Sequence, residues 1–440
     1  MQSIFQHRHL REAVERDLSA CQAKPHKSAT GSSTPEITLV SDNEKEGDAT
    51  TPTPMVAGVQ ASRPAEGDGK ITFLVGWKDD DIHNPRNWSL VKKWWTTIIV
   101  TLIGGALCIP SSIEAPVTNA FDEYYNVGPI AGSMTTGIYL IGFGVGSLFA
   151  GPFSETFGRN LVYIGSIVLF MIFTMAKALA PNFGAAIAFR FLAAFFGSPP
   201  LTCTGGSIAD IWNPLHITFG LPFYTMVAYA GPIAGPIIGA YLPGVGFRWA
   251  DWISLIISGA MLIVVILALP ETYSPLLLEW KASHFRELTG DSRYQVNEHA
   301  SLRTLGQHLI TNVYRPFLMT YTEPIILVFS FYLTILYIVL FTFLNGYPYI
   351  FQETYGITEP LTYILWCGML AGDGVALMLI PVVYGWTKKA VAKAEANGKE
   401  VEPEVCMYWS MMGGSFFLPI SLFWMGWTCY VRAPFHPSLL

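Results

Sequence analysis

The chain has 440 residues, of which 51% are hydrophobic and 13% are charged, and its formal net charge at pH 7 is −6. Ordinary soluble domains contain about one quarter charged residues, so this composition excludes a typical soluble protein and predicts one that is integral to a lipid bilayer. The small negative net charge gives no indication of a nucleic-acid partner.

The first part of the chain differs from the rest in composition. Residues 1 to about 80 are rich in Ser, Thr, Pro, Glu and Lys, and such a segment cannot bury enough apolar surface to offset the loss of chain entropy on folding. We therefore expect residues 1–92 to form a disordered cytosolic tail. The alternative at its very start is a short amphipathic helix.

Apolar segments of membrane-spanning length fill the remainder. A helix needs about 20 apolar residues to cross about 30 Å of hydrocarbon. Nine segments reach or approach this length: 94–117, 129–150, 161–180, 183–206, 218–243, 250–269, 322–344, 361–384 and 405–429. The sequence thus predicts an all-α polytopic membrane protein, with an N-terminal six-helix bundle (93–270), a central loop (271–321) and an incomplete C-terminal bundle of about three helices (322–440).

Basic residues fall on one side of the predicted spans. Arg86, Lys92 and Lys93 precede the first span, and further Lys and Arg residues gather in the central loop and after the eighth span. Because cytosolic loops carry an excess of Lys and Arg, we expect a multi-pass membrane protein with a cytosolic N-terminus and a cytosolic central loop. The plasma membrane is the default location, and the vacuole is the alternative.

The loop after the second span reads GPFSETFGRN, residues 151–160. Gly151 and the proline after it are expected to end the span, and Gly158 permits a tight turn. Glu155 would lie near the positive N-terminal end of the third span, and Arg159 can pair with an acid or with carbonyl groups at a span end. Two interpretations are open: a charged latch that stabilises one conformation, or a positive loop that only orients the protein.

The fifth span repeats glycine every four residues and adds prolines to the series: Gly231, Pro232, Gly235, Pro236 and Gly239. The glycines share one helix face and let another helix approach closely, while the prolines remove backbone donors and favour a kink. This face is either a static packing surface or a seam that moves during function. The second span carries a similar face, formed by Gly142, Gly146 and Ala150.

Ionisable residues are rare in the predicted spans, and four of them are candidates for proton coupling. Arg190 lies a turn or two inside the fourth span, where a charge needs a partner or a cavity; otherwise its side chain reaches the membrane surface. Asp373 interrupts the eighth span and is a candidate proton or cation site. Glu323 opens the seventh span and is alternatively a helix cap. Glu114, near the end of the first span, is alternatively a surface residue.

Several classes of function lack sequence support. The chain has no GxxxxGK[ST] motif for a nucleotide, no HExxH motif, and no histidine inside a predicted span that could ligate a metal. We therefore expect no nucleotide, cofactor or metal and no catalytic residues, so the protein is not expected to be an enzyme. The aromatic residues in and just after the seventh span suit contact with a flat, apolar compound.

Several longer stretches together resemble the major facilitator superfamily, and more closely its fungal 12-span drug:proton antiporters, which include polyamine, azole and toxin exporters. The stretches are NPRNWSLVKKWW (84–95), RFLAAFFGSPPLTCTGGSIADIW (190–212), GPIAGPIIGAYL (231–242), PETYSPLLLEWKA (270–282) and YTEPIILVFSFYLTILYIVLFTFLNGYPYIF (321–351). Gly151, Glu155, Gly158 and Arg159 fit the loop motif that the family carries after its second span.

This resemblance implies transport by alternating access, in which two six-helix bundles rock about a central site. Proton entry would drive a small organic compound out of the cytosol, so the partners would be that compound, protons and the lipid bilayer. The resemblance also implies a gating role for the loop residues, a role for Arg190 in proton coupling, and a hinge or seal at the glycines of the fifth span.

The resemblance raises an expectation about length as well. The family has twelve spans, with span 11 packed against span 2 and span 8 against span 5, whereas the predicted spans here end at the ninth. We therefore expect a chain truncated after span 9, in which the glycine face of the second span lacks its partner. The alternatives to an exporter are a facilitative carrier or sensor, and an inactive truncated fragment.

Overall fold

The structure is a computed structural model that describes residues 1–22, 58–62, 72–78, 80–296, 305–396 and 419–427. The chain divides into two compact units. The first unit contains Met1–Ser3, Pro85–Ser274 and Ala300–Leu440, and the second contains Ile4–Asn84 and Pro275–His299. Each unit has a hydrophobic core of its own.

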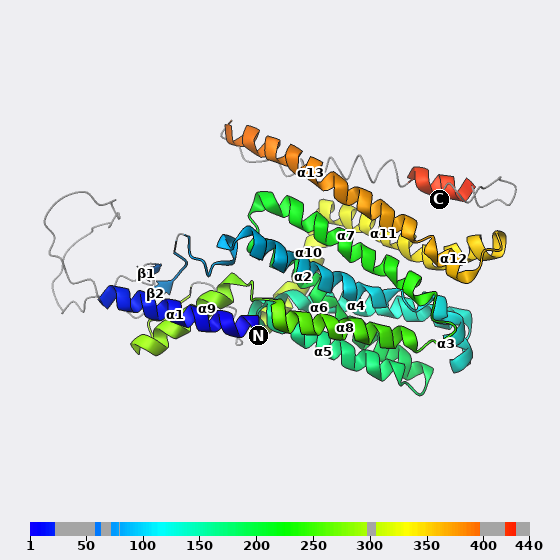
Figure 1. Ribbon diagram of the computed structural model, residues 1–440, viewed down its shortest axis with the longest axis horizontal. Helices are drawn as coiled ribbons and strands as arrows, with labels where there is room; N and C mark the ends of the chain where they lie inside the picture. The colour runs from blue at the N-terminus through cyan, green and yellow to red at the C-terminus, as the bar shows by residue number, and fades with distance from the viewer. Residues whose placement is uncertain (23–57, 63–71, 79, 297–304, 397–418, 428–440) are drawn as a thin grey trace. The chain divides into compact units, whose positions relative to one another are not determined.

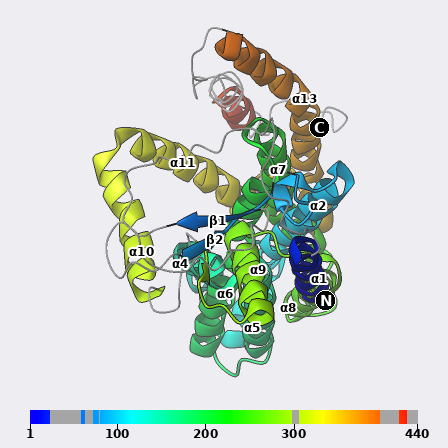
Figure 2. The same ribbon diagram turned by 90° about the vertical axis from the view of Figure 1, so that its left-hand side faces the viewer.

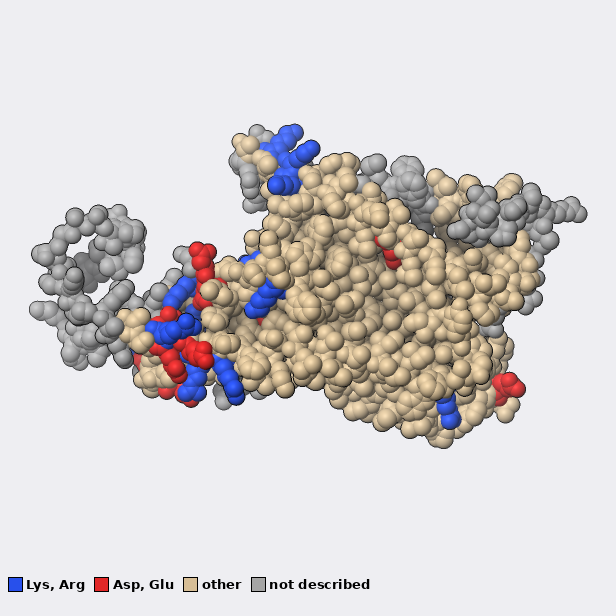
Figure 3. Space-filling model, in the orientation of Figure 1, with Lys and Arg blue, Asp and Glu red and all other residues tan. Residues whose placement is uncertain are grey.

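The first unit is a bundle of long apolar helices (Figure 1). Its N-terminal part consists of six of them: α2 (Leu90–Cys108), α4 (Pro129–Phe157), α5 (Arg159–Ala178), α6 (Phe183–Ile211), α7 (Pro214–Gly239) and α8 (Trp249–Ala268). Helix α6 packs against α4 and α5, α2 packs against α7, and α5 packs against α8. Figure 3 shows that one face of these helices carries almost no charged side chain along its length, as expected for a surface in contact with lipid.

Eight helical segments in the described part of the chain are long and apolar enough to cross a membrane. They confirm eight of the nine predicted spans and the prediction of an all-α polytopic membrane protein. The ninth predicted span, 405–429, lies mostly outside the described residues, and its described part, 419–427, is helical.

The first span ends earlier than predicted. Helix α2 stops at Cys108 and is followed by two short 3-10 turns, η2 (Ile109–Ser111) and η3 (Ala115–Val117), and by α3 (Thr118–Tyr125). Each of the two turns contains a proline, and proline lacks the N–H group that would continue an α-helix. As a result Glu114 lies in the connection between the two turns rather than on a continuous helix.

The second span continues further than predicted. Helix α4 does not end at Gly151 but runs through a buried Pro152 to Phe157. The missing N–H of one proline is tolerated inside a membrane helix because neighbouring groups satisfy the freed backbone. The helix ends at Gly158, whose φ of +89° is a conformation that residues with a Cβ rarely adopt, so this glycine makes the tight turn into α5 as expected.

The glycine face of the fifth span is a close-packed surface. Helix α7 is continuous from Pro214 to Gly239, so His216, which was expected outside the spans, lies in its first turn. A Cβ at Gly235 would lie 2.3 Å from Ser112 Oγ, and one at Gly239 would lie 2.3 Å from the Ile113 carbonyl oxygen. The face therefore packs directly on the end of α2 and on the segment that contains η2.

The glycine face of the second span has a partner, contrary to prediction. A Cβ at Gly142 would lie 2.5 Å from the Phe191 carbonyl oxygen, and one at Gly146 would lie 2.2 Å from that of Phe195. Both contacts are with α6, the fourth span. The two spans approach closely because glycine has no side chain on the face where their backbones meet.

The helices that follow the central loop are α10 (Leu305–Thr322), α11 (Pro324–Tyr347), α12 (Glu359–Ile364) and α13 (Cys367–Ala396), with a π-helical turn, η4 (Pro348–Thr354), after α11. Helix α13, the eighth span, packs against α7, the fifth, as the resemblance implies (Figure 2). Tyr363 and Trp366 are buried in this region together with Ile233 and Ala240.

The second unit combines the start of the chain with the central loop. It contains most of α1 (Gln2–Gln22) and α9 (Ser274–Thr289), and the strands β1 (Val59–Ser62), β2 (Thr72–Val75) and β3 (Tyr294–Gln295). The sheet order is β1-β2-β3; β1 and β2 are antiparallel, β2 and β3 are parallel, and Phe73 lies opposite Tyr294.

The described parts of residues 1–92 contain these elements, and α1 agrees with the alternative of a helix at the start of the chain. Residues 23–57 and 63–71, for which disorder was predicted, lie outside the described residues. The buried residues of this unit come from both parts of the chain: Val14, Phe73, Val75, Ala282, Phe285 and Tyr294. The tail alone contains too few apolar residues for a core, but those of the central loop complete one. A prediction from local composition does not include such distant partners.

Candidate functional site

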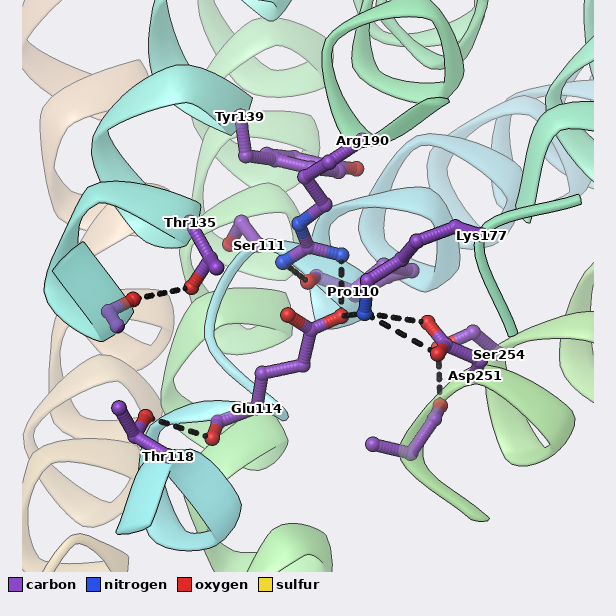
Figure 4. A network of polar contacts seen from close by, with 12 residues as sticks. Pro110, Ser111, Glu114, Thr118, Thr135, Tyr139, Lys177, Arg190, Asp251 and Ser254 are labelled. Carbon is purple, nitrogen blue, oxygen red and sulfur yellow. Dashed lines mark hydrogen bonds and ion pairs between the residues drawn. The ribbon is translucent and has the colours of Figure 1, made fainter. Parts of the chain in front are cut away.

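Four ionisable side chains meet at one end of the N-terminal bundle (Figure 4). Glu114 follows α2, Lys177 lies in the last turn of α5, Arg190 lies in the second turn of α6 and Asp251 lies in the first turn of α8. Because neighbouring spans run in opposite directions, these positions fall at the same end of the bundle. Each of the four residues is at most 6% exposed.

Arg190 binds Glu114 and the backbone between the first two spans. One guanidinium nitrogen lies 2.8 Å from Glu114 Oε1, and another donates to the Pro110 carbonyl oxygen at 2.7 Å. The ring of Tyr139, from α4, lies 4.3 Å from the guanidinium carbon (Figure 4), which is a cation–π contact. Nε of Arg190 has no protein partner among the described residues.

Lys177 connects Glu114 with Asp251. Its Nζ donates to Glu114 Oε1, the oxygen that Arg190 also binds, and lies 2.9 Å and 3.1 Å from the two carboxylate oxygens of Asp251. The order Arg190–Glu114–Lys177–Asp251 therefore alternates in charge. Two acids and two bases give a neutral set, which lowers the cost of taking four charges out of water. Here the set ties together the connection after α2 and the helices α5, α6 and α8.

The cluster decides two of the sequence alternatives. Glu114 is buried and paired, so the alternative of a surface residue was wrong, because the prolines that end α2 turn this residue inward. Arg190 is 2% exposed, so its side chain does not reach the membrane surface. Lys177 and Asp251 were not among the predicted site residues. A signal was present, because each is an ionisable residue near the end of a predicted apolar span.

The other two proton-coupling candidates lie elsewhere. Asp373, in α13, is half-buried, and its Oδ2 is buried without a protein partner in the described part of the chain. Glu323 is exposed directly before Pro324, the first residue of α11, which agrees with a position at a helix start. Among the described residues, neither makes a hydrogen bond or an ion pair with the Arg190 cluster.

A second polar cluster lies at the opposite end of the same bundle. Arg159 Nε lies 3.3 Å from Asp210 Oδ2, in the last turn of α6, and a terminal guanidinium nitrogen donates to Ser154 Oγ of α4. A Cβ at Gly206 would lie 2.7 Å from Arg159 Nη2, so this glycine makes room for the guanidinium. The contacts connect the ends of α4, α5 and α6.

Glu271, which follows α8, closes this cluster. Its two carboxylate oxygens each accept a backbone N–H of the first turn of α5, from Arg159 and Asn160, both at 3.1 Å. The backbone N–H groups of Thr272 and Tyr273 also donate to Oε1. Burial raises the pKa of the Glu271 carboxyl, and the four backbone donors oppose that rise. The carboxylate thereby caps the free N–H groups of α5.

Glu155 was predicted to lie near the N-terminal end of the third span, and the structure places it differently. Because α4 continues past Pro152, Glu155 lies on the last turn of α4 rather than near the start of α5, and its side chain is exposed. The acids that contact Arg159 are Asp210 and Glu271. Both lie within stretches that carried the resemblance, at 190–212 and 270–282, although neither was singled out.

An all-helical bundle of apolar spans, with ion pairs buried inside it, defines a multi-pass integral membrane protein. The model of the Major Facilitator Superfamily matches residues 94–435. The chain therefore belongs to this superfamily, and it is a transporter rather than an enzyme.

Curated relatives agree with this assignment. The chain is 41% identical over 393 residues to the MFS-type transporter kojT of Aspergillus flavus. This match covers 88% of this chain and 70% of that protein. It is 33% identical to the MFS-type transporter acdC of Aspergillus candidus, over 82% of this chain and 72% of that protein. An uncharacterized transporter of Schizosaccharomyces pombe, C794.04c, is also 33% identical, and the chain spans 66% of its length.

The similar solved structures are more distant in sequence. The proton:xylose symporter XylE shares 14% identity with a TM-score of 0.46, over 68% of this chain and 69% of that one. The human organic anion transporter MFSD10 shares 16% identity with a TM-score of 0.41, over 69% of this chain and 76% of that one.

Proposed function

We propose that the protein exports small organic compounds in exchange for protons, by alternating access. The observation that carries this proposal is the buried cluster of Glu114, Lys177, Arg190 and Asp251. Protonation of a carboxylate in this cluster would remove a charge on which the local packing depends. The chain spans about two thirds of the length of several relatives, so the activity of the whole protein is part of the proposal.

Protonation of Glu114 would change the contacts between spans. The ionised carboxylate holds both Arg190 on α6 and Lys177 on α5. After protonation Lys177 keeps Asp251 as its partner, whereas the partners that Arg190 keeps among the described residues are the Pro110 carbonyl group and the ring of Tyr139. The connection after α2 is then less firmly bound to α6. Such a difference between two protonation states is what a proton needs in order to shift a conformational equilibrium.

The Arg159 cluster is suited to act as the gate at the other end. The ion pair of Arg159 with Asp210 and the capping of α5 by Glu271 hold four helix ends in one arrangement. These are the ends of α4, α5, α6 and α8. Breaking these contacts would let the spans separate there. We assign the gating role to Gly158, Arg159, Asp210 and Glu271, with Gly151 and Glu155 as neighbours on α4.

The substrate class rests on aromatic residues. The rings of Tyr337 and Phe341 of α11 are stacked, with centroids 6.4 Å apart. The ring centroid of Tyr337 lies 5.9 Å from that of Tyr229 of α7. Rings of this kind suit flat, apolar or cationic compounds, such as drugs, toxins, secondary metabolites or polyamines. The basic residues before the first span and in the central loop support a cytosolic N-terminus, and we propose the plasma membrane as the location.

Transport of a flat cationic dye such as rhodamine 6G tests the proposal. Everted vesicles with an acidic interior should accumulate the dye, and a protonophore or Arg190→Ala should abolish accumulation. Arg248→Ala is the matched control, because Arg248 lies at the same end and contacts Tyr124, outside the cluster. Accumulation that is indifferent to both the gradient and Arg190→Ala contradicts proton coupling. Counterflow without any gradient would instead support a facilitative carrier.

A further inference from the structure

Asp373 is a carboxylate in a membrane span that has no cation near it on the neighbouring spans. It lies in α13, and its Oδ2 is buried without a hydrogen-bond partner in the described part of the chain. Helices α7 and α11 contain no Lys or Arg. On α13 itself the first basic residue is Lys388, about 22 Å along the helix from Asp373. Because an unpaired charge inside a bilayer is costly, this carboxylate requires a proton or a cation from outside the chain.

The side of α13 that carries Asp373 faces α7. Leu370, one turn before Asp373, packs on a buried cluster that includes Ile233 of α7. Three turns after Asp373, the ring of Tyr384 lies 6.3 Å from the ring of Phe219, also in α7. Residues three and eleven positions apart lie on one face of a helix with 3.6 residues per turn. Asp373 therefore lies between these two contacts, on the face of α13 that packs against α7.

Two tyrosines lie at the same depth as Asp373. Ile233 of α7 and Phe341 of α11 both belong to the cluster on which α13 packs. Tyr229 precedes Ile233 by one turn, and Tyr337 precedes Phe341 by one turn. Asp373 follows the cluster by one turn on α13, which runs antiparallel to α7 and α11. The three steps therefore lead in the same direction along the bundle, and they bring the acid to the level of the paired tyrosine rings.

The acid and the rings together favour one kind of ligand. Tyr337 is 43% exposed and Tyr229 is half-buried, so both rings keep surface that a ligand can contact. The face of an aromatic ring attracts a positive charge, and a neighbouring carboxylate adds an opposite charge. A proton would make no use of the rings, and a neutral compound would make no use of the acid. An organic cation uses both.

We propose that Asp373, Tyr229 and Tyr337 form a subsite for an organic compound that carries a single positive charge. This inference rests on the proposed function and narrows its substrate class. Helices α7 and α11 contain no Asp or Glu, so a second positive charge on the ligand would find no acid there. The subsite thus suits a flat monocation better than a polyamine, whose several charges are separated along its length.

Binding to the purified full chain in detergent tests this subsite. The probe is a cationic dye, (dimethylaminostyryl)-N-methylpyridinium, whose fluorescence anisotropy reports its binding. Its parent, (dimethylaminostyryl)pyridine, lacks the N-methyl group and is uncharged in mildly alkaline buffer. We expect Asp373→Asn to weaken binding of the dye at least about tenfold, because it removes one partner of a charge pair. The affinity for the neutral parent should not change.

Two variants and a third compound serve as controls. Asp373→Glu keeps the negative charge and should retain most of the affinity for the dye. Glu123→Gln removes a carboxylate from an exposed position of α3, away from the subsite, and should bind both compounds as wild type does. A bis-pyridinium analogue of the dye carries two charges and should bind to wild type more weakly than the dye. Size-exclusion chromatography verifies the folding of each variant.

Several outcomes would overturn the subsite. An equal loss of affinity for the dye and its parent in Asp373→Asn would assign a structural role to this side chain. Unchanged dye affinity in that variant, tighter binding of the dication, or no binding of the dye to wild type would also contradict the inference. If Asp373→Asn does not fold, the three compounds are compared on wild type. A preference for the dye over both others supports a single charge, and its absence overturns the inference.

Proton-driven accumulation of rhodamine 6G separates this inference from the proposed function. Because rhodamine 6G is also a single cation, Asp373→Asn should lower its accumulation in everted vesicles. Accumulation by this variant at the wild-type level would overturn the subsite and leave proton-driven export in place. Conversely, no accumulation by wild type, together with loss of dye binding in Asp373→Asn, would overturn proton-driven export and leave the subsite in place.

Discussion

At the scale of single residues, the buried charges depend on one another. Lys177 binds both acids of the cluster, and it contacts Asp251 through both carboxylate oxygens. Removing one partner of a buried pair leaves an uncompensated charge, whereas removing a pair together removes most of that cost. The cluster should therefore tolerate paired substitutions better than single ones.

We expect Lys177→Met to destabilise the protein by about 3–5 kcal/mol, because it leaves Asp251 buried without a cation. Lys177→Met combined with Asp251→Asn should cost less than Lys177→Met alone. The measurement is the unfolding temperature of the purified protein in detergent for both single variants and the double variant. Additive destabilisation by the two substitutions would show that the two side chains are not coupled.

The site was predictable in part at this scale. Sequence analysis could identify Arg190 and Glu114, because a charged residue in an apolar span is unusual whichever way its side chain faces. Their pairing with Lys177 and Asp251 was not, because it depends on which ends of separate spans meet. Glu155 illustrates the same limit. Helix α4 continues about two turns beyond the predicted end of the span, so Glu155 lies on α4. The acid that pairs with Arg159 is Asp210, 51 residues after Arg159.

At the scale of elements, α7 shows how a helix can contain prolines without breaking. Pro236 has no N–H, so the Pro232 carbonyl oxygen loses its partner within the helix. Ser112 Oγ donates to that oxygen at 2.6 Å. The segment that contains η2 therefore supplies the missing hydrogen bond while the glycines of α7 let it approach. The close packing of α7 on this segment thus supplies a hydrogen bond that the α7 backbone lacks, in addition to matching the shape of the glycine face.

Adding a methyl group to this surface should be costly. In Gly235→Ala the new Cβ would lie 2.3 Å from Ser112 Oγ and 2.8 Å from the Ile109 carbonyl oxygen, so we expect a loss of about 1–3 kcal/mol from overpacking. Gly205→Ala in α6 is the matched control, because its Cβ would meet open space. The unfolding temperature should decrease clearly for Gly235→Ala only. Equal changes in the two variants would mean that helix propensity, rather than the contact with Ser112, determines the effect.

The positions of the spans could be predicted, but several of their ends could not. Apolar length alone located eight helices, because a lipid bilayer requires every spanning backbone to be hydrogen-bonded internally. The ends of α2 and α4 depend on prolines whose local effect differs. Pro110 and Pro116 accompany the end of a helix, whereas Pro152 lies inside one. Neighbouring helices make that difference, and no single segment contains the information.

At the scale of the whole molecule, the second unit joins parts of the chain that are distant in sequence. Lys78 pairs with Asp17 at 2.6 Å, and Lys281 pairs with Asp81 at 3.2 Å. Phe285 stacks on Tyr294 with ring centroids 5.2 Å apart. The central loop is therefore not an independent linker, because its first half has a core in common with the start of the chain.

This unit should respond to acid through one histidine. His284 is buried, and its ring lies 4.4 Å from that of His7. Burial, and then the neighbouring His7, lower the pKa of His284, with Glu287 and Arg11 as the other charged groups nearby. Since the folded pKa lies below the unfolded one, the unfolded chain binds the proton more readily. The stability contributed by neutral His284 is complete above about pH 6.5 and is lost as the pH falls through the folded pKa.

Hydrogen exchange can check this expectation. Amide protection in α1 and α9, corrected for intrinsic rates, should fall on acidification below about pH 6.5. His284→Gln, which carries no charge in this range, should lose this pH dependence, whereas protection in α5 and α6 should serve as the internal reference. An identical response in the variant would assign the effect to another group.

The second unit was not predictable from the sequence. Its strands are short, and β2 pairs with β3 across more than two hundred residues of chain. Whether strands at such a separation can pair depends on the path of the spans between them. Local composition does not contain that information.

The shared core of α1 and α9 has a consequence for translation. The gene product contains a second methionine in its leading segment, Met55, and a ribosome that initiated there would make a protein with every described span but without Val14. The buried faces of Ala282 and Phe285 would lose the residue that covers them. Newly exposed apolar surface of this kind is what chaperones and proteases recognise, so a chain begun at Met55 is expected to be degraded faster than the full chain.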